Sequence, residues 1–321
     1  MAVYTQVAFE ELGPLLACYD IGEPVSFKGI AEGVENSNFQ LRTDRGAFIL
    51  TLFEKRVREP DLPFFLGLMR HFSKRGIPCP VPVACSDGSD WTHISGHPAA
   101  LLSWLDGLSL RRPQVPHCAE AGRACARLHL AAEGFALHRP NALSGTRLGE
   151  LAASTVDKAD GVQPGLGELI SQTLVSIGRD WPDALPSGVI HADLFPDNVL
   201  FLNDRISGLI DFYFACNDFF AFDVAVMLNA WCFEPDGTYN LTKGTALLSG
   251  YTNERILARA ELDALPVLAR GAALRFLLTR LYDWLNPRPQ SMVFQKDPKE
   301  FAKRLRFHLG ATNAAAYGLN S

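Results

Sequence analysis

The sequence lacks several features that would assign it to a membrane or to nucleic acid. No apolar run approaches the roughly 18 residues that a membrane-spanning helix requires. Lysine and arginine form no cluster, and the net charge is -5, so neither nucleic acid nor an anionic membrane is an expected partner. The first residues show no basic start followed by an apolar stretch, so we expect no signal peptide and a cytoplasmic location.

The cysteines also exclude two classes of site. There are seven, which is an odd number, and they are scattered without any C-x-x-C pair. Neither a disulfide framework nor a zinc site is therefore indicated. Repeats and low-complexity tracts are missing as well, which leaves an ordinary globular composition of 48% hydrophobic and 20% charged residues.

A chain of 321 residues is longer than one compact core usually serves, so we expect two lobes. Alternating apolar residues and turn signals predict an N-terminal β-rich lobe over residues 1–103. Its helices are expected at 9–19 and 62–75, and its strands at 26–30, 38–42, 47–53, 80–83, 93–94 and 99–102.

The remainder, residues 104–321, is predicted to be a larger α-rich lobe. Its apolar residues recur mostly at helical spacing. The expected helices are 120–132, 167–177, 223–229, 242–249, 261–284 and 298–307. The fold class is therefore α+β, with a small antiparallel sheet in the first lobe and helices in the second.

Polar side chains in the second lobe are spaced as phosphoryl transfer requires. The motif His191-x-Asp193-x-x-x-x-Asn198 follows an apolar run, and Asp211 comes after another. In the corresponding protein-kinase motif the Asp accepts the substrate hydroxyl proton, the Asn holds a magnesium ion and a later Asp holds the metal that bridges the phosphates. We therefore expect His191, Asp193, Asn198 and Asp211 to form a catalytic site, with Asn198 and Asp211 as the metal ligands.

A purely structural alternative exists for this motif. Pro196 and Asp197 can make a turn that Asn198 caps. The flanking apolar runs, however, predict a loop, a strand, a turn and a second strand that ends at Asp211, so that the polar groups can meet at one end. This context favours catalysis.

The first lobe should supply a loop that covers nucleotide phosphates. Residues 29–38 lie between two predicted strands, and Gly33 permits a tight backbone conformation there. An ordinary hairpin loop is the alternative. No G-K-[ST] follows, so this is not a Walker A loop. We expect Gly33, Asn36, Ser37 and Asn38 to contact the nucleotide.

Charged and polar residues of the second lobe suggest a small zwitterionic substrate, which needs a cation for its carboxylate and a carboxylate for its ammonium group. An exposed, salt-bridged stripe is the alternative for the arginines. His129 is expected to be structural, and for Asp223 an N-capping or loop-anchoring role and direct catalysis both stay open as alternatives. The expected substrate contacts are Tyr213, Asn217, Asp218, Arg275 and Arg280.

The motif Val189–Asn198, with Leu209–Tyr213, resembles the aminoglycoside phosphotransferase/choline kinase superfamily, whose members are relatives of protein kinases. Further blocks are similar to bacterial homoserine kinases of the type built on that fold. These blocks are residues 27–38, 49–56, 211–218 and 270–276. The resemblance runs from about Tyr4 to His308, nearly the whole chain.

The resemblance implies a protein-kinase-like two-lobed fold and ATP-dependent phosphorylation of the L-homoserine side-chain hydroxyl, with Mg²⁺, on the route to threonine. Asp193 would orient and deprotonate that hydroxyl, and Ser103 and Leu105 would offer hinge contacts to the nucleotide. Other small alcohols, such as choline, an aminoglycoside or methylthioribose, remain alternative substrates, and a non-catalytic nucleotide-binding regulator is a more distant alternative. The sequence does not specify an oligomeric state.

The chain departs from the kinase pattern at one position. Where kinases place the lysine that pairs with the phosphates, Thr51 stands in this sequence. Lys55 shares the strand parity of Thr51, and Lys28 is expected across the sheet. We list Lys55 as the expected replacement, with Lys28 as the alternative.

Overall fold

The computed structural model describes residues 5, 7–30, 36–54, 57–287 and 295–319. These residues form two compact units. The first contains the chain up to Asp106 together with Gly208–Tyr213, and the second contains Gly107–Ser207 and most of the chain after Tyr213. The domain boundary expected after residue 103 stays a prediction.

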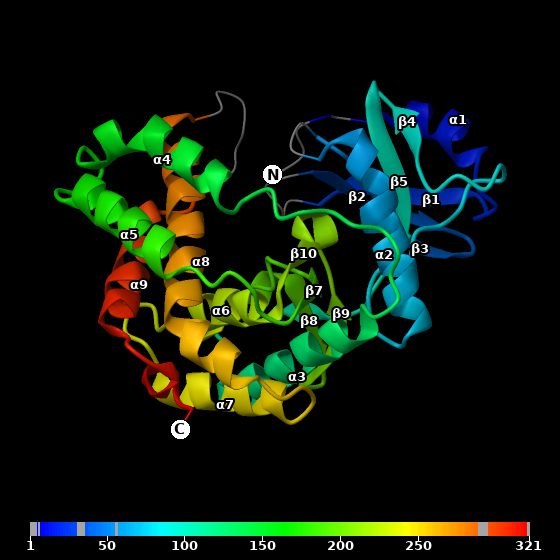
Figure 1. Ribbon diagram of the computed structural model, residues 1–321. Helices are drawn as coiled ribbons and strands as arrows, with labels where there is room; N and C mark the ends of the chain where they lie inside the picture. The colour runs from blue at the N-terminus through cyan, green and yellow to red at the C-terminus, as the bar shows by residue number, and fades with distance from the viewer. Residues whose placement is uncertain (1–4, 6, 31–35, 55–56, 288–294, 320–321) are drawn as a thin grey trace. The chain divides into compact units, whose positions relative to one another are not determined.

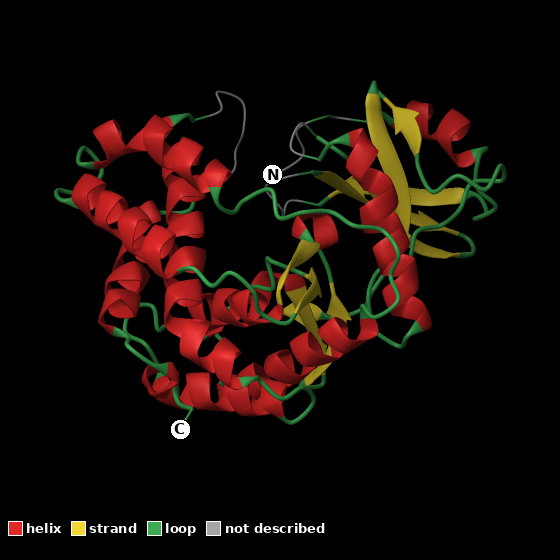
Figure 2. Cartoon of the chain, in the orientation of Figure 1, coloured by secondary structure: helices red, strands yellow, loops and turns green. Residues whose placement is uncertain are grey.

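The first unit is built on a five-stranded antiparallel sheet in the order β1-β2-β3-β5-β4 (Figures 1 and 2). The sheet agrees with the expected N-terminal strands, apart from shifted ends. Its strands are β1 (Pro24–Gly29), β2 (Ser37–Thr43), β3 (Gly46–Leu52), β4 (Thr92–Ile94) and β5 (His97–Ser103).

Strand alternation gives this sheet an apolar face. Side chains two residues apart share a face, so Leu50 and Leu52 of β3 lie with Phe39 and Leu41 of the neighbouring β2. The short helix α1 (Leu12–Leu16), which follows the 3₁₀ turn η1 (Phe9–Glu11), contributes to the same buried cluster. The opposite face therefore carries the other parity, which includes Thr51.

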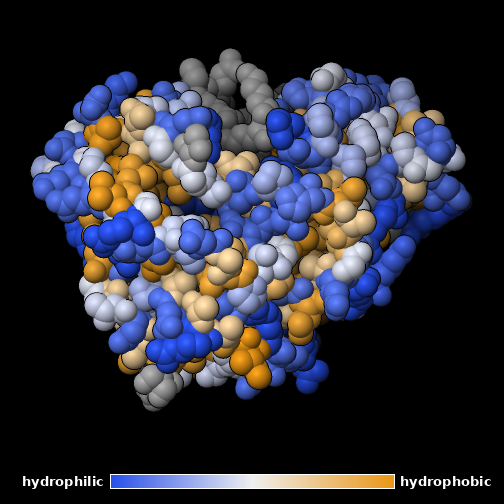
Figure 3. Space-filling view, in the orientation of Figure 1, coloured by the Kyte–Doolittle hydropathy of each residue, from blue (hydrophilic) through white to orange (hydrophobic). Residues whose placement is uncertain are grey.

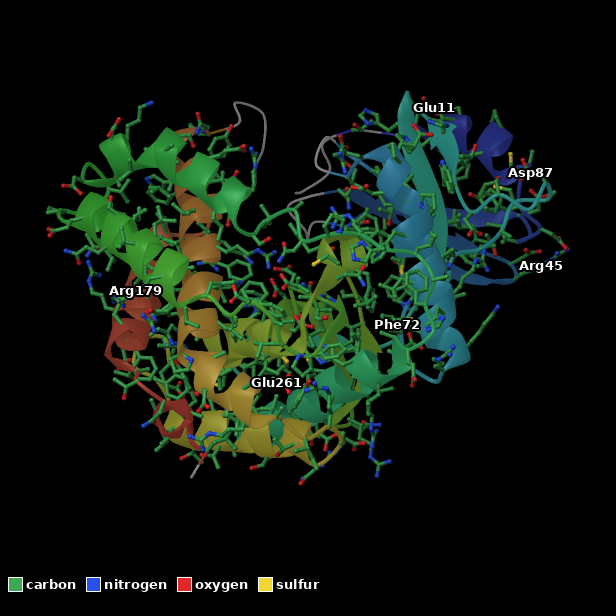
Figure 4. All side chains as sticks on the ribbon, viewed as in Figure 1. Glu11, Arg45, Phe72, Asp87, Arg179 and Glu261 are labelled. Carbon is green, nitrogen blue, oxygen red and sulfur yellow. The ribbon has the colours of Figure 1, made fainter. Side chains whose placement is uncertain are left out.

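Helix α2 (Leu62–Lys74), preceded by η2 (Glu59–Asp61), completes the first unit. Its buried residues recur at helical spacing, and Pro63 at its start suits the first turn, where no backbone donor is required. Phe72, labelled in Figure 4, packs on Phe212 with ring centroids 5.6 Å apart. The segment that follows the catalytic motif in sequence is thus anchored on α2.

The second unit is mainly helical, and the long helix α8 packs against α4, α5, α6 and α9. Pro266 lies inside α8, which nevertheless continues to Leu285. The helices are α3 (Val115–Ala131), α4 (Thr146–Ala159), α5 (Leu166–Asp180), α6 (Phe220–Trp231), α7 (Leu241–Thr252), α8 (Arg259–Leu285), α9 (Pro298–Gly310) and the 3₁₀ turn η5 (Ala314–Tyr317).

Helices α3 and α7 approach each other closely because glycines face backbone on both sides. A Cβ atom at Gly122 would lie 2.0 Å from the carbonyl oxygen of Leu247, and one at Gly250 would lie 2.0 Å from that of Ala119. Only glycine fits such a contact. This approach brings residues at the C-terminal ends of the two helices together.

Short strands position the catalytic motif. Strand β7 pairs with β10, and β8 lies between β6 and β9. The motif occupies the loop from β7 to β8 and includes the 3₁₀ turn η3. Their bounds are β6 (Leu108–Ser109), β7 (Ser187–Ile190), η3 (Pro196–Asn198), β8 (Val199–Leu202), β9 (Arg205–Leu209), η4 (Phe212–Phe214) and β10 (Cys216–Phe219).

The α+β fold with a β-rich first part and a helical second part is confirmed. The strand expected at 80–83 is wrong: only Pro82 makes an isolated bridge, to Leu102. Prolines at 80 and 82 cannot donate to a strand ladder, which explains the failure. Helix α4 and strand β10 were not expected.

No helix among the described residues is long and apolar enough to cross a membrane. On the face drawn in Figure 3, hydrophobic residues are interspersed with hydrophilic ones.

Candidate active site

The catalytic motif holds its own aspartate in place. The side-chain Nδ2 of Asn198 donates to the main-chain oxygen of Asp193 at 2.7 Å and to the Oδ2 atom of the Asp193 carboxylate at 3.1 Å. The Nδ1 atom of His191, which is fully buried, accepts the backbone N–H of Asp193 at 3.3 Å. The structure thus brings three of the expected catalytic residues together and fixes the direction of the Asp193 carboxylate.

Asp223 of α6 anchors the start of this loop. Its Oδ2 atom accepts the N–H of His191 at 2.8 Å, and its Oδ1 atom accepts the N–H of Ala192 at 2.8 Å. Ala192 has a φ angle of +62°, a left-handed conformation that costs an alanine about 1–2 kcal/mol. The carboxylate therefore holds a strained residue directly before Asp193, which is the loop-anchoring role.

His129 of α3 supports Asp223 from the other side. Its Nε2 atom lies 3.0 Å from Oδ2 of Asp223, and neither side chain is exposed. Burial by itself raises the pKa of Asp223, but its hydrogen bonds with the His129 ring and with the N–H of His191 outweigh that effect and hold the pKa below its ordinary value. Asp223 is therefore an anion, which the two N–H groups of the loop require.

Arg275 of α8 holds the same loop through a carbonyl. Its side chain is 1% exposed, and Nη1 donates to the main-chain oxygen of Ala192 at 2.5 Å. Burial lowers the pKa of Arg275, while the negative charge of Asp193 acts in the opposite sense. Both the N–H and the C=O of Ala192 are thus bound by buried charged groups, an anion and a cation.

Arg280 lies five residues further along α8 and has a different environment. It forms an ion pair with Glu300 at 2.5 Å, and its guanidinium stands 4.4 Å from the ring centroid of Phe301. An exposed stripe describes neither arginine, because Arg275 is buried and the side chain of Arg280 is only 11% exposed. The salt bridge expected in that alternative is present for Arg280, which pairs with Glu300 of α9. The structure does not bring the two arginines to one site.

The expected contacts Asn217 and Asp218 lie on β10. Oδ1 of Asn217 accepts the N–H of Arg139 at 2.9 Å, and Oδ2 of Asp218 accepts a hydrogen bond from Asn141 at 2.7 Å. Burial raises the pKa of Asp218, against that hydrogen bond. Arg139 and Asn141 were missed in the sequence because they lie in a segment without regular spacing, more than seventy residues before β10.

Asp211 and Tyr213 belong to the first unit. Asp211 follows β9 and has a φ angle of +65°. Tyr213 packs edge-on against Phe53 and Phe65, with centroid distances of 5.2 and 5.7 Å, and burial raises the pKa of its hydroxyl against a hydrogen bond with Thr51. The structure therefore places Tyr213 beside the strand position that lacks the lysine.

The expected nucleotide contacts at the start of β2 stabilise the sheet. Asn38 accepts a hydrogen bond from Thr51 at 2.8 Å, and Ser37 donates to Glu54 at 2.7 Å. Oδ1 of Asn36 accepts the N–H of Glu54 at 3.3 Å. Gly33 and Lys55 lie outside the described residues.

Lys28 lies on the same face of the sheet as Thr51. It pairs with Gln40 of β2, which pairs with Ile49 of β3, and Ile49 and Thr51 have the same parity. Its side chain is exposed. Lys28 is therefore a cation on the face that carries Asn38 and Thr51.

The expected hinge residues close the first unit. Ser103 ends β5, and both its N–H and its Oγ are bonded to the backbone of Val81 at 2.9 Å. Leu105 follows and is half-buried. The nucleotide contacts expected for Ser103 and Leu105 stay predictions.

Comparison with known proteins adds independent evidence. Residues 26–258 match the model of the phosphotransferase enzyme family (APH). The homoserine kinase of Sinorhizobium medicae (strain WSM419) is 58% identical over 319 residues, which cover 99% of this chain and 98% of that protein. The homoserine kinase of Parvibaculum lavamentivorans (strain DS-1 / DSM 13023 / NCIMB 13966) is 58% identical over 321 residues, 100% of both chains.

Solved structures share the fold at far lower sequence identity. The amicoumacin kinase hAmiN, in complex with AMP-PNP, Ca²⁺ and Ami, has a TM-score of 0.72 at 15% identity and covers 94% of this chain and 93% of its own. A choline kinase from Cryptosporidium parvum Iowa II has a TM-score of 0.64 at 16% identity, with 94% and 95% covered. From the family match, which spans most of the chain and includes the catalytic loop described above, it follows that the chain belongs to the phosphotransferase enzyme family.

Proposed function

We propose that the chain is an ATP-dependent homoserine kinase, which transfers the γ-phosphoryl group of ATP to the side-chain hydroxyl of L-homoserine. The observation that carries this proposal is the 58% identity to homoserine kinases over practically the whole chain. The intact catalytic loop supports it, since a non-catalytic relative would have no need for the aspartate that the loop holds in place. A cytoplasmic location belongs to the same proposal.

In the proposed reaction, Asp193 accepts the proton of the homoserine hydroxyl as its oxygen attacks the γ-phosphorus. The bond from that phosphorus to the β-bridging oxygen breaks, and ADP leaves. Asn198 directs the Asp193 carboxylate through its amide nitrogen. The Nδ1 atom of His191 accepts the backbone N–H of Asp193 and supports the same residue. These residues orient the nucleophile, and orientation is the main protein contribution in phosphoryl transfer.

The residues proposed as metal ligands fit Mg²⁺ chemically. Magnesium prefers oxygen ligands, and Asp211 offers a carboxylate. The amide nitrogen of Asn198 is bonded to Asp193, so the carbonyl oxygen of that amide is the atom that remains for a cation. When bound, Mg²⁺ would neutralise charge on the phosphate oxygens. We retain Asn198 and Asp211 as its proposed ligands.

The zwitterion of homoserine requires recognition of both charges. Asp218, which is half-buried on β10, is the proposed partner of the substrate ammonium group. Arg275 stays the first proposal for the substrate carboxylate, because its buried Nε–H has no hydrogen-bond partner among the described residues. Tyr213, Asn217 and Arg280 are further proposed contacts, although each already packs or bonds within its own unit.

A coupled ADP-release assay tests the function. Purified protein should turn over L-homoserine with kcat/KM at least about a hundredfold above choline, methylthioribose and an aminoglycoside, since a buried charged contact to each end of the zwitterion discriminates at that level. Detection of O-phospho-L-homoserine by ³¹P NMR identifies the product. Preference for any of the other alcohols would overturn the substrate assignment, and absence of turnover with all four would overturn the catalytic one.

A further inference from the structure

A chain of buried polar side chains leads away from the catalytic loop. Oδ2 of Asp223, which holds the loop, lies 3.0 Å from Nε2 of His129, and Nδ1 of His129 lies 2.8 Å from the hydroxyl of Tyr251 on α7. Nη1 of Arg255 reaches that hydroxyl at 3.2 Å. The close approach of α3 and α7 at Gly250 makes the contact between His129 and Tyr251 feasible.

The chemistry of these groups fixes the direction of each hydrogen bond. Arginine only donates, so the oxygen of Tyr251 accepts from Arg255. The hydroxyl hydrogen of Tyr251 is then free to point at Nδ1 of His129, which accepts it. A neutral imidazole has one N–H, and with Nδ1 as acceptor that hydrogen is on Nε2, directed at Asp223.

An ion pair between Arg255 and Glu261 ends this series of buried polar side chains. Glu261, labelled in Figure 4 at the start of α8, accepts from Arg255 at 3.0 and 3.2 Å and is completely buried. The same carboxylate accepts the N–H of Ala258 at 2.9 Å, so the loop after α7 is tied to α8. Arg255 therefore has a fixed position from which it orients the Tyr251 hydroxyl.

We infer that Tyr251 and Arg255 are positioning residues for phosphoryl transfer, because they hold His129 in the Nε2–H form that donates to Asp223. The inference rests on the proposed function. If His129 carried its hydrogen on Nδ1, its Nε2 lone pair would face the Asp223 carboxylate. Asp223 would then lose a donor while still carrying the N–H groups of His191 and Ala192. The orientation of Asp193 depends on that backbone.

The chain offers a matched control for this relay. In the same unit, the hydroxyl of Tyr317 lies 3.0 Å from Nδ1 of His308, and Nε2 of His308 lies 3.0 Å from Oδ1 of Asn229 on α6. Tyr317 and His308 are fully buried, like Tyr251. Asn229 donates to the carbonyls of Ala225 and Ala269, in contrast to Asp223, which accepts from the catalytic loop.

The test compares Tyr251→Phe with Tyr317→Phe. Each variant removes one hydroxyl from a buried Tyr–His pair, so both should lose thermal stability. Only Tyr251→Phe should lower kcat, by about five- to twentyfold, with KM for ATP and homoserine within about twofold of the unchanged protein. Equal kcat values for the two variants would overturn the inference.

A second measurement does not depend on turnover. ¹⁵N NMR of the histidine rings should show His129 as the Nε2–H tautomer in the unchanged protein and a loss of that pure form in Tyr251→Phe. An Nδ1–H tautomer in the unchanged protein would overturn the inference. Absence of homoserine-dependent ADP release would overturn the proposed function alone, because the tautomer is read independently.

Arg255→Lys keeps the inference testable if Tyr251→Phe does not fold. Lysine retains the charge beside Glu261 but lacks the fork with which arginine serves both Glu261 and Tyr251. The variant should lower kcat in the same sense by about two- to fivefold, with KM unchanged. Full activity of Arg255→Lys, together with an unaltered His129 tautomer, would exclude a role for Arg255.

Discussion

Arg275→Met separates two roles of the same guanidinium. Methionine keeps an unbranched apolar stem in the buried space, but it cannot donate to the carbonyl oxygen of Ala192, which Arg275 binds at 2.5 Å. A hydrogen bond from a charged donor contributes about 1.5–3 kcal/mol. Ala192 has a strained φ angle of +62°, so its backbone should shift toward an unstrained conformation once that bond is lost.

The magnitude follows from this bond. If the full 1.5–3 kcal/mol is missing in the transition state because Asp193 is misplaced, kcat should fall by about 10- to 150-fold. KM for homoserine should rise as well, because Arg275 is also the proposed partner of the substrate carboxylate. If Arg275 binds the carboxylate without positioning the loop, only KM for homoserine should rise and kcat should be largely kept.

Steady-state kinetics with homoserine and ATP varied in turn distinguish these outcomes. The control is Arg304→Met: Arg304 is 8% exposed, and its Nη1 donates to the main-chain oxygen of Asn229 at 2.5 Å, away from the catalytic loop. It should lose stability but keep kcat within about twofold. An unchanged kcat in Arg275→Met, or an equal loss in both variants, would refute the positioning of the loop by Arg275.

Other predictions follow from the remaining proposed roles. Asp193→Asn should lower kcat by about 10²–10⁴-fold while ATP binding by calorimetry stays intact, and retention of more than about a tenth of kcat would exclude Asp193 as the base. Asp211→Ala should raise the Mg²⁺ concentration needed for half-maximal rate, and an unchanged magnesium dependence would contradict its assignment as a ligand. Lys55→Ala should raise KM for ATP about tenfold with little effect on KM for homoserine, whereas the same result at Lys28→Ala alone would identify Lys28 as the phosphate-pairing cation.

The catalytic motif could be predicted because its parts are close in sequence. Asp193 and Asn198 are separated by a single loop, so their spacing alone determines that they can meet. The sheet was predictable for a related reason, since alternation along a strand reports a face directly. The strand predicted at 80–83 was wrong because the apolar residues suggested a strand although the two prolines cannot donate hydrogen bonds to a ladder, so only one isolated bridge forms.

The buried support of the loop could not be predicted in the same way. His129 and Asp223 are 94 residues apart, and His129 and Tyr251 are 122 apart. Their contacts depend on how α3, α6 and α7 pack, which no local pattern specifies. Gly122 and Gly250, at helical positions otherwise unfavourable for glycine, were the available signal that these helices approach closely.

Arg275 shows why a charged residue on an apolar helix is easily interpreted from sequence as a substrate contact. In sequence, a cation among buried leucines has no visible partner, so a ligand is the natural explanation. The structure supplies an internal partner, the carbonyl of Ala192, opposite the N–H that Asp223 accepts. Asp223 and Arg275 thus carry opposite charges on the two sides of one strained residue. Burial lowers the pKa of Arg275, and the negative charge of Asp223 acts in the opposite sense. The two side chains bind the peptide groups on either side of Ala192, so the loop requires both, and a substrate role for either residue has to be compatible with this structural role.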